Sequence, residues 1–444
     1  MAEESTIYAP ATAPGRSGLA VVRLSGPHAA ESLQRLTGRA LPEPRYIVRR
    51  SINDPSTHET LDEAMVAWFP APGSFTGETV AELYLHGGRA VLAAILTALG
   101  RLPNLKLAEP GEFTRRAFLN GRLDLTEVEG LADLIAAETE AQRRQALRQL
   151  EGTLGRLYQA WSDSLTAALA RLEAAIDFPD EDLPANLIVS VAEQVGPVAE
   201  AIAKHLADGH RGERLREGFS VAILGPPNAG KSSLFNALVR REAAIVSPQP
   251  GTTRDVLEAA LDLGGYPVLL ADTAGLRRSR NEIEAEGVRR AERRGAEADL
   301  RIFVLDAERM VEQLPNLLKF KGDQDLMVAN KIDLLAGRKL PEWGLPILSI
   351  SIHSGTGLNE LAGLVAEKAA KAMDSGASPV LTRARHRAAL EETLTALRRG
   401  AKAPDAELLA EDLRLAVRAL GRITGRIDVE DLLDRIFSEF CIGK

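Results

Sequence analysis

The chain has 444 residues, too many for one hydrophobic core, and its length indicates about three domains. Its 54 Lys and Arg against 62 Asp and Glu give a net charge of −8, which excludes nucleic-acid binding by overall charge and leaves that role to a local basic patch.

One cysteine, Cys441, excludes an internal disulfide and fits a reducing compartment. The N-terminus lacks the pattern of a secretory signal, and the longest apolar run, 90–100, has about half the length that a bilayer requires. We therefore expect a cytoplasmic protein without a membrane segment.

Residues 1–118 have the pattern of a mixed α/β domain. Apolar and β-branched runs predict strands at 19–24, 64–69 and 79–85, and a helix at 90–102. Glycine-rich corners at 14–18 and 86–88 are typical of turns, although glycine also lets a backbone approach a ligand closely.

From residue 119 the pattern becomes helical. Apolar residues at spacings of three and four predict one long helix over 147–176, which ends at Phe178-Pro179, and a second helix over 187–206. Apolar stripes of this length need partner helices, and the first half of the chain does not supply enough of them.

The partner helices are predicted near the C-terminus, at 382–397, 405–420 and 428–440, the last with Asp428 in the N-cap position. We therefore expect one helical domain in two parts, 119–211 and 377–444, with a nucleotide-binding domain, 212–376, inserted between them. Such an insertion couples the two domains mechanically, because both ends of the inserted domain enter the same bundle.

The inserted segment carries a phosphate-binding loop, Gly225-Pro-Pro-Asn-Ala-Gly-Lys-Ser-Ser233. It follows an apolar run at 219–224, which predicts a strand, and precedes the start of a helix at 234–238. In this context bare backbone N–H groups wrap a polyphosphate, and the helix N-terminus faces it. Lys231 would reach the β and γ phosphates, and the Ser232 hydroxyl would bind Mg²⁺.

Two further motifs follow. Ser247-Pro-Gln-Pro-Gly-Thr-Thr-Arg-Asp255 is rich in turn residues and precedes a predicted strand at 256–263; Thr253 is our choice for a hydroxyl that binds Mg²⁺ when the γ-phosphate is present. Asp272-Thr-Ala-Gly275 follows a predicted strand at 266–271. There Asp272 would lie in the second shell of the metal, and the Gly275 N–H would face the γ-phosphate.

The base is indicated by Asn330-Lys-Ile-Asp333, which follows predicted strands at 299–305 and 325–329. The Asp333 carboxylate can accept hydrogen bonds from the N1–H and 2-amino groups of guanine, which adenine does not offer. A carboxylate left unpaired there costs a few kcal/mol, about 10² to 10⁴ in affinity. A strand at 348–351 leads to a loop that contacts the base near Ser351. Four motifs in this order indicate a GTPase with a mostly parallel sheet.

Together these motifs assign the GTP contacts to Asn228, Ala229, Gly230, Lys231, Ser232, Ser233, Ser247, Pro248, Gln249, Pro250, Gly251, Thr252, Thr253, Asp272, Thr273, Ala274, Gly275, Asn330, Lys331, Asp333 and Ser351. Leu276 stands where many small GTPases have the glutamine that orients the attacking water, so another group must do this. Glu284 is a candidate, although most exposed glutamates near a helix start are simply solvated.

Motifs along the whole chain resemble those of one family, the tRNA-modification GTPases called MnmE or TrmE. They are Asn228 in the phosphate loop, Gly251-Thr-Thr-Arg-Asp255, Asp272-Thr-Ala-Gly-Leu276, the terminal Cys441-Ile-Gly-Lys444, Pro14-Gly-Arg16, Ser74-Phe-Thr-Gly-Glu78, His86-Gly-Gly88, Pro110-Gly-Glu-Phe113 and Ala117-Phe-Leu-Asn120. The resemblance implies a homodimer formed by N-terminal folate-binding domains, a central helical domain, and GTPase domains that pair across the dimer.

The same resemblance implies a partner, the FAD-dependent protein MnmG (GidA), in a heterotetramer or larger complex. With it the family installs an aminomethyl-type group, such as carboxymethylaminomethyl, on C5 of the wobble uridine of certain tRNAs. The carbon comes from a reduced folate, 5-formyl- or methylene-tetrahydrofolate. The implied folate contacts are Arg23, Glu82, Arg122 and Lys444, with Arg122 in a position that often holds lysine.

The family also uses K⁺ to activate hydrolysis. The implied K⁺ ligands are Asn228, the carbonyls of Ser247 and Gln249, and Thr252. Both Ser247 and Gln249 precede a proline, which holds them extended and could preset those carbonyls, or merely stiffen the loop. K⁺ could replace an arginine finger by neutralising phosphate charge. Glu284 matches the family's catalytic carboxylate.

Two departures from the family pattern are Ile352-His353 after Ser351 and the basic run Arg277-Arg-Ser-Arg280.

Cys441 is either an inert thiol near the chain end or a chemical participant whose pKa is lowered by Lys444. Candidate tRNA patches are Arg143-Arg144 with Arg148, Arg289-Arg290 with Arg293-Arg294, and Arg398-Arg399, although the pattern of each favours a solvated helix face.

Two alternatives remain open beside a tRNA-modifying GTPase. One is a ribosome-assembly or RNA-binding switch, which the helical C-terminal segment disfavours because such GTPases usually append an RNA-binding module. The other is a folate-binding scaffold that leaves all carbon chemistry to the flavoprotein. The sequence identifies neither the tRNAs, nor the nitrogen donor, nor the size of the GTPase-domain motion.

Overall fold

The computed structural model divides the chain into two compact units. Unit 1 comprises Met1–Ala132, Gln149–Thr166 and Val417–Lys444, and unit 2 comprises Asp133–Arg148 and Ala167–Ala416. The structure describes residues 5–177, 187–241, 244–245, 258–272, 298–318, 322, 324–335, 338–341, 343–374, 376, 379–427, 430–438, 440 and 442–444. Within these residues no helix is both long enough and apolar enough to cross a bilayer.

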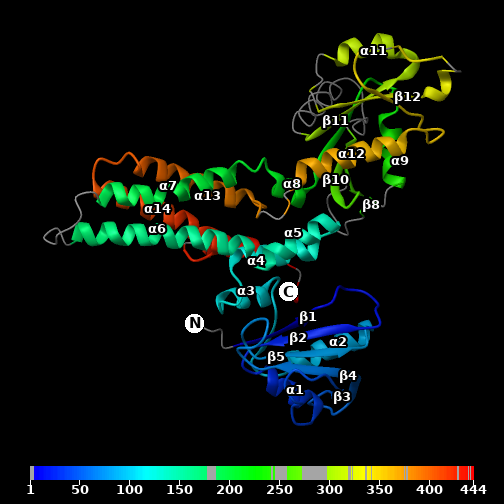
Figure 1. Cartoon of the computed structure of the whole chain (residues 1–444). Helices are drawn as coiled ribbons and strands as arrows, with labels where there is room; N and C mark the ends of the chain where they lie inside the picture. The colour runs from blue at the N-terminus through cyan, green and yellow to red at the C-terminus, as the bar shows by residue number, and fades with distance from the viewer. Residues whose placement is uncertain are drawn as a thin grey trace, which may run out of the picture. The chain divides into compact units, whose positions relative to one another are not determined.

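Unit 1 is built on a six-stranded sheet of order β3-β4-β5-β2-β1-β6 (Figure 1). Its strands are β1 (Thr6–Pro10), β2 (Ala20–Ser25), β3 (Val48–Asn53), β4 (Thr60–Phe69), β5 (Val80–Leu85) and β6 (Leu105–Leu107). The pairs are antiparallel except for β1 with β6. The strands predicted at 19–24, 64–69 and 79–85 correspond to β2, β4 and β5, and the predicted helix at 90–102 to α2 (Arg89–Gly100).

One face of this sheet is apolar, and α2 and α1 (Ala29–Thr37) cover it. Along β2 the residues alternate, so that Val22 and Leu24 are buried in the core with Leu83 of β5. Arg23 therefore lies on the opposite face, and the register places it directly across from Glu82.

The end of the chain packs within unit 1. Helices α3 (Glu112–Leu119), α15 (Glu430–Ser438) and the first part of α4 (Leu125–Ala136) share an apolar cluster that includes Phe437 and Phe440. Ile442 pairs with Pro110, and a Cβ added to Gly443 would lie 1.9 Å from the Pro10 carbonyl oxygen. The terminal residues thus lie against the end of β1.

Unit 2 contains a seven-stranded sheet of order β13-β12-β11-β7-β10-β9-β8. Its strands are β7 (Phe219–Leu224), β8 (Ala244–Ile245), β9 (Glu258–Leu263), β10 (Tyr266–Asp272), β11 (Leu300–Asp306), β12 (Leu326–Asn330) and β13 (Ile347–Ser349). The pairs from β13 to β10 are parallel, and β9 pairs antiparallel with β10 and β8. This confirms the expected mostly parallel sheet, whose strands are apolar because both faces are covered.

Helices α8 (Arg211–Glu217), α9 (Lys231–Arg241), α11 (Met310–Leu317) and α12 (Leu358–Met373) accompany this sheet. The parallel strands matter for the site because their carboxyl ends share one edge, where ligands of open α/β sheets bind. The loops after β7, β11 and β12 all leave the sheet at this edge.

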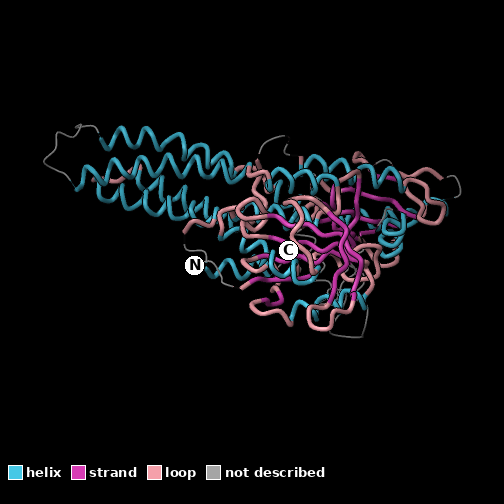
Figure 2. Tube along the Cα trace, turned by 90° about the horizontal axis from the view of Figure 1, so that it is seen from below, coloured by secondary structure: helices cyan, strands magenta, loops and turns pink. Residues whose placement is uncertain are grey.

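Long helices complete unit 2: most of α5 (Glu140–Leu150), the end of α6 (Thr153–Asp177), α7 (Leu187–Leu206), α13 (Ala384–Gly400) and most of α14 (Ala406–Thr424). Helices α7 and α13 lie side by side in both views (Figures 1 and 2). Arg414 of α14 bonds to Glu173 of α6 at 3.0 Å, so segments far apart in sequence meet here. The helices predicted at 187–206, 382–397, 405–420 and 428–440 correspond to α7, α13, α14 and α15.

The single long helix predicted over 147–176 is wrong. The chain forms two helices there, because α5 ends at Leu150 and α6 begins at Thr153. Gly152 between them has φ +78°, a left-handed conformation that ends a helix and that glycine adopts without strain.

Candidate nucleotide-binding site

The predicted phosphate loop connects β7 to α9. Gly225 has φ +145°, and an added Cβ there would lie 2.1 Å from the Val304 carbonyl oxygen of β11. Gly230 has φ +102°, and its added Cβ would lie 2.3 Å from Asn330 Nδ2. Asn228 is exposed and also left-handed, at φ +64°, a conformation that asparagine tolerates better than most residues. The loop therefore depends on glycine at both ends.

Lys231 begins α9 and folds back over the loop. Its Nζ donates to the carbonyl oxygens of Gly225 and Pro226, both at 2.9 Å. Ser232 and Ser233 follow in the first turn of α9 and are exposed. A cation, exposed hydroxyls and the N-terminal N–H groups of an 11-residue helix thus share one position, which suits an anion with a bound divalent metal.

Asn330 joins the predicted base-reading segment to this loop. It ends β12 and is 2% exposed. Its Nδ2 donates to the Ala229 carbonyl at 2.9 Å, and its Oδ1 accepts the Ile352 N–H at 3.4 Å. The structure therefore brings together the phosphate loop, the base segment and the loop after β13.

Asp333 and Ser351 are also in contact, since the Ser351 hydroxyl donates to Asp333 Oδ1 at 2.5 Å. Ser351 in turn accepts the Ser354 N–H at 3.2 Å. The hydrogen bond from Ser351 holds the pKa of Asp333 below its usual range, and the charge of His353 acts in the same direction. The carboxylate is exposed and ionised, as an acceptor for guanine must be.

Lys331 has φ +68°, and its ammonium bonds to Asp306 Oδ2 at 2.6 Å. Asp306 is the one residue of this group that sequence reasoning missed. The available signal was its position, directly after the buried run of β11 and hence at the carboxyl edge of the sheet. Asp325, by contrast, lies at the opposite end of β12, where it pairs with Arg301 at 2.7 Å.

Several predicted site residues lie outside the described part of the chain. They are Ser247, Pro248, Gln249, Pro250, Gly251, Thr252, Thr253, Thr273, Ala274, Gly275, Glu284 and Cys441, together with Asp428 and the basic runs 277–280 and 289–294. Asp272 is described as the last residue of β10, without its side chain. The roles of these residues stay predictions.

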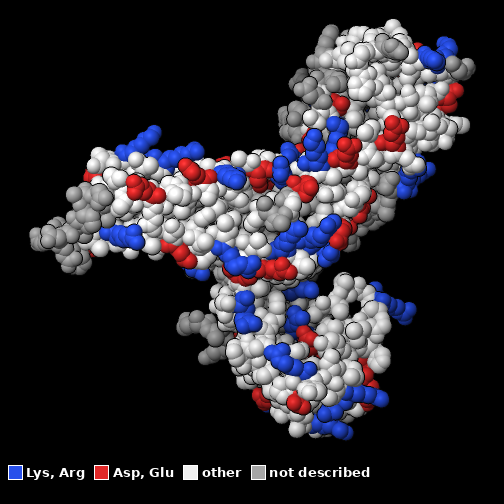
Figure 3. Space-filling model, in the orientation of Figure 1, with Lys and Arg blue, Asp and Glu red and all other residues white. Residues whose placement is uncertain are grey.

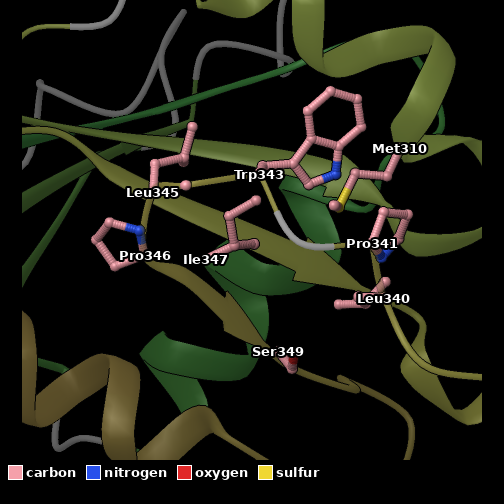
Figure 4. Close-up of a pocket in the computed structure, with 9 residues that line it drawn as sticks. Met310, Leu340, Pro341, Trp343, Leu345, Pro346, Ile347 and Ser349 are labelled. Atoms are coloured by element: carbon pink, nitrogen blue, oxygen red, sulfur yellow. The ribbon is translucent and has the colours of Figure 1, made fainter.

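A pocket of about 480 Å³ lies elsewhere in unit 2, beside the edge strand β13 (Figure 4). Its lining is mainly apolar: Met310, Leu340, Pro341, Trp343, Gly344, Leu345, Pro346, Ile347 and Ser349. It includes none of the predicted nucleotide contacts. Its mainly apolar lining does not fit a polyphosphate.

Two of the predicted folate contacts meet in unit 1. Arg23 Nε donates to Glu82 Oε1 at 2.9 Å, and the Tyr84 hydroxyl donates to Glu82 Oε2 at 2.5 Å. Burial and the bond to Glu82 raise the pKa of Tyr84 to about 12. The Arg23 guanidinium lies 5.6 Å and 5.9 Å from the ring centres of Phe75 and Phe113. Polar and aromatic groups thus meet on the sheet face opposite α1 and α2, where Phe113 of α3 is also buried, a combination that suits a planar heterocycle.

The other two predicted folate residues also belong to unit 1. The Arg122 N–H donates to the Ala117 carbonyl at 2.8 Å, and the side chain lies beside Gly77. Lys444 follows Gly443, which packs against Pro10 at the end of β1. The structure brings Arg23 and Glu82 into contact and gives no contact of either with Arg122 or Lys444.

The candidate basic patches that are described are largely paired. Arg143 and Arg144 both contact Glu140, at 2.8 Å and 3.3 Å. Arg148 donates to the Gly376 carbonyl at 2.5 Å, and Arg399 pairs with Asp412. On the face drawn in Figure 3, Lys and Arg side chains alternate with Asp and Glu over the helices. These arginines therefore fit solvated helix faces at least as well as a phosphate-binding surface.

Comparison with known proteins agrees with the residues described above. The family profile described as "MnmE helical domain" matches residues 125–441, and the profile "GTP-binding protein TrmE N-terminus" matches 6–122. A solved structure, the G domain of the T. maritima FeoB iron transporter, is 29% identical over 34% of this chain and 98% of its own, with a TM-score of 0.26. At that score the likeness adds nothing to the assignment.

Full-length relatives are more informative. The tRNA modification GTPase MnmE of Parvibaculum lavamentivorans is 57% identical over 99% of this chain and 100% of its own length. The protein of the same name from Rhodospirillum rubrum is 56% identical over 99% of each chain. Two profiles that together span most of the chain, and relatives matched from end to end, lead to one conclusion: this chain belongs to the MnmE family of tRNA modification GTPases.

Proposed function

We propose that this chain binds and hydrolyses GTP at the carboxyl edge of the unit 2 sheet and that hydrolysis drives modification of tRNA. The observation that carries the proposal is the bond between Asn330 and Ala229, because it joins a phosphate-binding loop to a base-reading segment. Lys231 would hold the β and γ phosphates, and Asp333 would accept from the guanine N1–H and 2-amino groups.

The metals of this proposal follow from the donor types present. The Ser232 hydroxyl is exposed in the first turn of α9 and suits Mg²⁺, with Thr253 as a second ligand. Asn228 presents an exposed side chain from the same loop and would bind K⁺ together with Thr252 and the carbonyls of Ser247 and Gln249. K⁺ would supply positive charge beside the phosphates, and Glu284 would orient the attacking water.

The finer function concerns the tRNA. We propose that the sheet face around Arg23 and Glu82, with Arg122 and Lys444, binds a reduced folate that supplies one carbon to C5 of the wobble uridine. The support is chemical: a carboxylate suits the pterin N–H groups, and cations suit the folate glutamate tail. The remaining elements of the proposal are a homodimer, an FAD-dependent MnmG-type partner and a cytoplasmic location. The names of the relatives support tRNA as the substrate.

The test is mass spectrometry of tRNA nucleosides from a strain that lacks this gene. We expect the C5-substituted wobble uridine to vanish, to return with the intact gene, and to stay absent with Lys231→Ala. Asp325→Asn is the matched control, since it removes an ion pair far from the phosphate loop and is expected to restore the nucleoside. An unchanged nucleoside profile in the deletion strain would reject the tRNA function and leave a GTPase switch.

The folate step needs a separate test. Glu82→Gln is expected to weaken binding of 5-formyltetrahydrofolate and to leave the rate of GTP hydrolysis unchanged, because the residue lies in unit 1. If this variant loses folate binding but keeps the modified nucleoside, the folate role is wrong. If Cys441→Ser keeps folate binding and full modification, the thiol takes no part in the chemistry, as a scaffold function requires.

A further inference from the structure

Asp306 lies beside the base-reading segment, and its N–H and both carboxylate oxygens are hydrogen-bonded. It ends β11, and the parallel register places it opposite Asn330, one residue before Lys331. Its Oδ2 accepts from Lys331 Nζ at 2.6 Å, its Oδ1 accepts the Glu308 N–H at 3.0 Å, and its own N–H donates to Gln313 Oε1 at 3.1 Å. The bonds to Glu308 and Gln313 therefore hold Asp306 in place, and its carboxylate can hold the Lys331 side chain.

Lys331 needs such a partner to keep one conformation. Its φ of +68° costs a non-glycine residue about 1 kcal/mol or more, and a lysine side chain loses up to about 2 kcal/mol of rotamer entropy when it is immobilised. The side chain of Asp306 is 12% exposed and that of Lys331 is 33% exposed. An ion pair with a mostly buried carboxylate thus fixes the direction of the Lys331 side chain.

We infer that Asp306 is a positioning residue for recognition of the guanine base and acts through Lys331. The inference rests on the proposed function of this site. The stem of Lys331 would form one wall of the base pocket, and Asp306 would keep that wall in place without touching the nucleotide. GTP and GDP carry the same base, so both depend on the wall, whereas cleavage of the γ-phosphate does not.

Asp306→Asn is the informative variant. The asparagine keeps the shape of the side chain and an oxygen for the Glu308 N–H, but it removes the charge that holds Lys331. We expect the Kd values of fluorescent GDP and of a non-hydrolysable fluorescent GTP analogue to rise by the same factor, about tenfold, which corresponds to about 1.4 kcal/mol. KM for GTP should rise equally, with kcat unchanged.

Asp325→Asn is the matched control. Asp325 is also a mostly buried carboxylate, 6% exposed in its side chain, and pairs with Arg301 at 2.7 Å. It precedes β12 at the end away from Asn330. Its loss should lower the midpoint temperature of unfolding and leave both Kd values within about twofold.

Lys331→Met tests the same ion pair from the other side, since methionine keeps most of the stem and lacks the ammonium. It should give the tenfold loss, and the double variant Asp306→Asn, Lys331→Met should lose no more than either single variant. Losses that multiply, or wild-type affinity in Asp306→Asn, would overturn the inference alone. If the wild-type chain bound neither nucleotide, the proposed function would fail as well.

Discussion

Asn330 donates a hydrogen bond of 2.9 Å to the carbonyl of Ala229, and both residues are buried. The two are 101 positions apart in sequence, one at the end of β12 and the other in the loop after β7. Because β7 and β12 both flank β11 in a parallel arrangement, their carboxyl ends lie at one edge. The bond therefore ties the loop after β7 to the end of β12 at this edge of the sheet.

Asn330→Ala should weaken nucleotide binding. It removes the hydrogen bond and leaves the Ala229 carbonyl without that partner, at a cost of about 1–3 kcal/mol, or roughly 5- to 150-fold in Kd. The measurement is titration with fluorescent GDP. Asn120→Ala is the control, because Asn120 donates a similar bond of 2.7 Å to the Thr76 carbonyl in unit 1. An unchanged Kd in Asn330→Ala would mean that the bond does not support the site.

Gly230→Ala should have a larger effect. The new methyl group would lie 2.3 Å from Asn330 Nδ2, and φ of +102° is strained for alanine. Displacement of Asn330 adds to this strain, so we expect GDP affinity to fall by about 100-fold or more. Gly209→Ala is the control. Gly209 has φ +69° but open space around it, so this variant should lower stability without changing GDP affinity. Similar GDP affinities in the two variants would contradict the steric argument.

The spacing of apolar residues was enough to predict a helix where the same spacing continues along one buried face. The predicted helix 187–206 has the observed bounds of α7, and Val191, Val195, Val198 and Ile202 are all buried. The break at Gly152 could not be predicted in this way, because apolar spacing of three and four continues across it. The structure shows the difference, since Leu147 is 38% exposed and Leu154 is 1% exposed. The spacing of apolar residues alone does not show whether two consecutive segments bury the same face of one helix.

The candidate site was predictable where its residues are contiguous. The loop 225–233 and the tetrad 330–333 each carry their chemistry within a few residues, so residue type and flanking strands indicate the role. Asp306 was not predictable in this way, because its partner Lys331 follows a different strand, β12. That contact exists because β11 and β12 are neighbours in the sheet, and the sequence pattern does not specify the order of the strands.

Stability should fall as the pH drops below about 6.5, the ordinary pKa of histidine. Burial lowers the pKa of His205 in the folded state, and the charges of His386 and Arg387 act in the same direction, against an opposing effect of Asp208. Below that pH the unfolded chain binds a proton that the folded chain excludes, so stability decreases by at most about 1.4 kcal/mol per pH unit for this one group.

The measurement is the urea midpoint at pH 7.5 and pH 5.5 for the wild type and His205→Gln. The variant should show a smaller decrease between the two values. His58→Gln, which removes an exposed histidine of unit 1, should match the wild type. If His205→Gln kept the full wild-type decrease, another group would account for the acid sensitivity.

Asp133→Asn should loosen the contact that joins α8 to the residue before α13. Asp133 Oδ1 accepts from Arg216 of α8 at 3.2 Å and from Arg383, just before α13, at 2.7 Å. Asparagine keeps an acceptor oxygen, but the two arginines, 30% and 10% exposed in their side chains, lose their shared negative charge. We expect a loss of about 2–3 kcal/mol and faster hydrogen exchange in α8 and at the start of α13, with GDP affinity unchanged.

Glu411→Gln provides the comparison. Its carboxylate pairs with Arg414 at 3.2 Å, but the two side chains are 58% and 49% exposed, so solvent screens the interaction and the loss of stability should be clearly smaller than in Asp133→Asn. Urea unfolding of both variants separates the cases. Equal losses would mean that the shared carboxylate of Asp133 contributes no more than an exposed ion pair, and that the two chain segments are joined by packing alone.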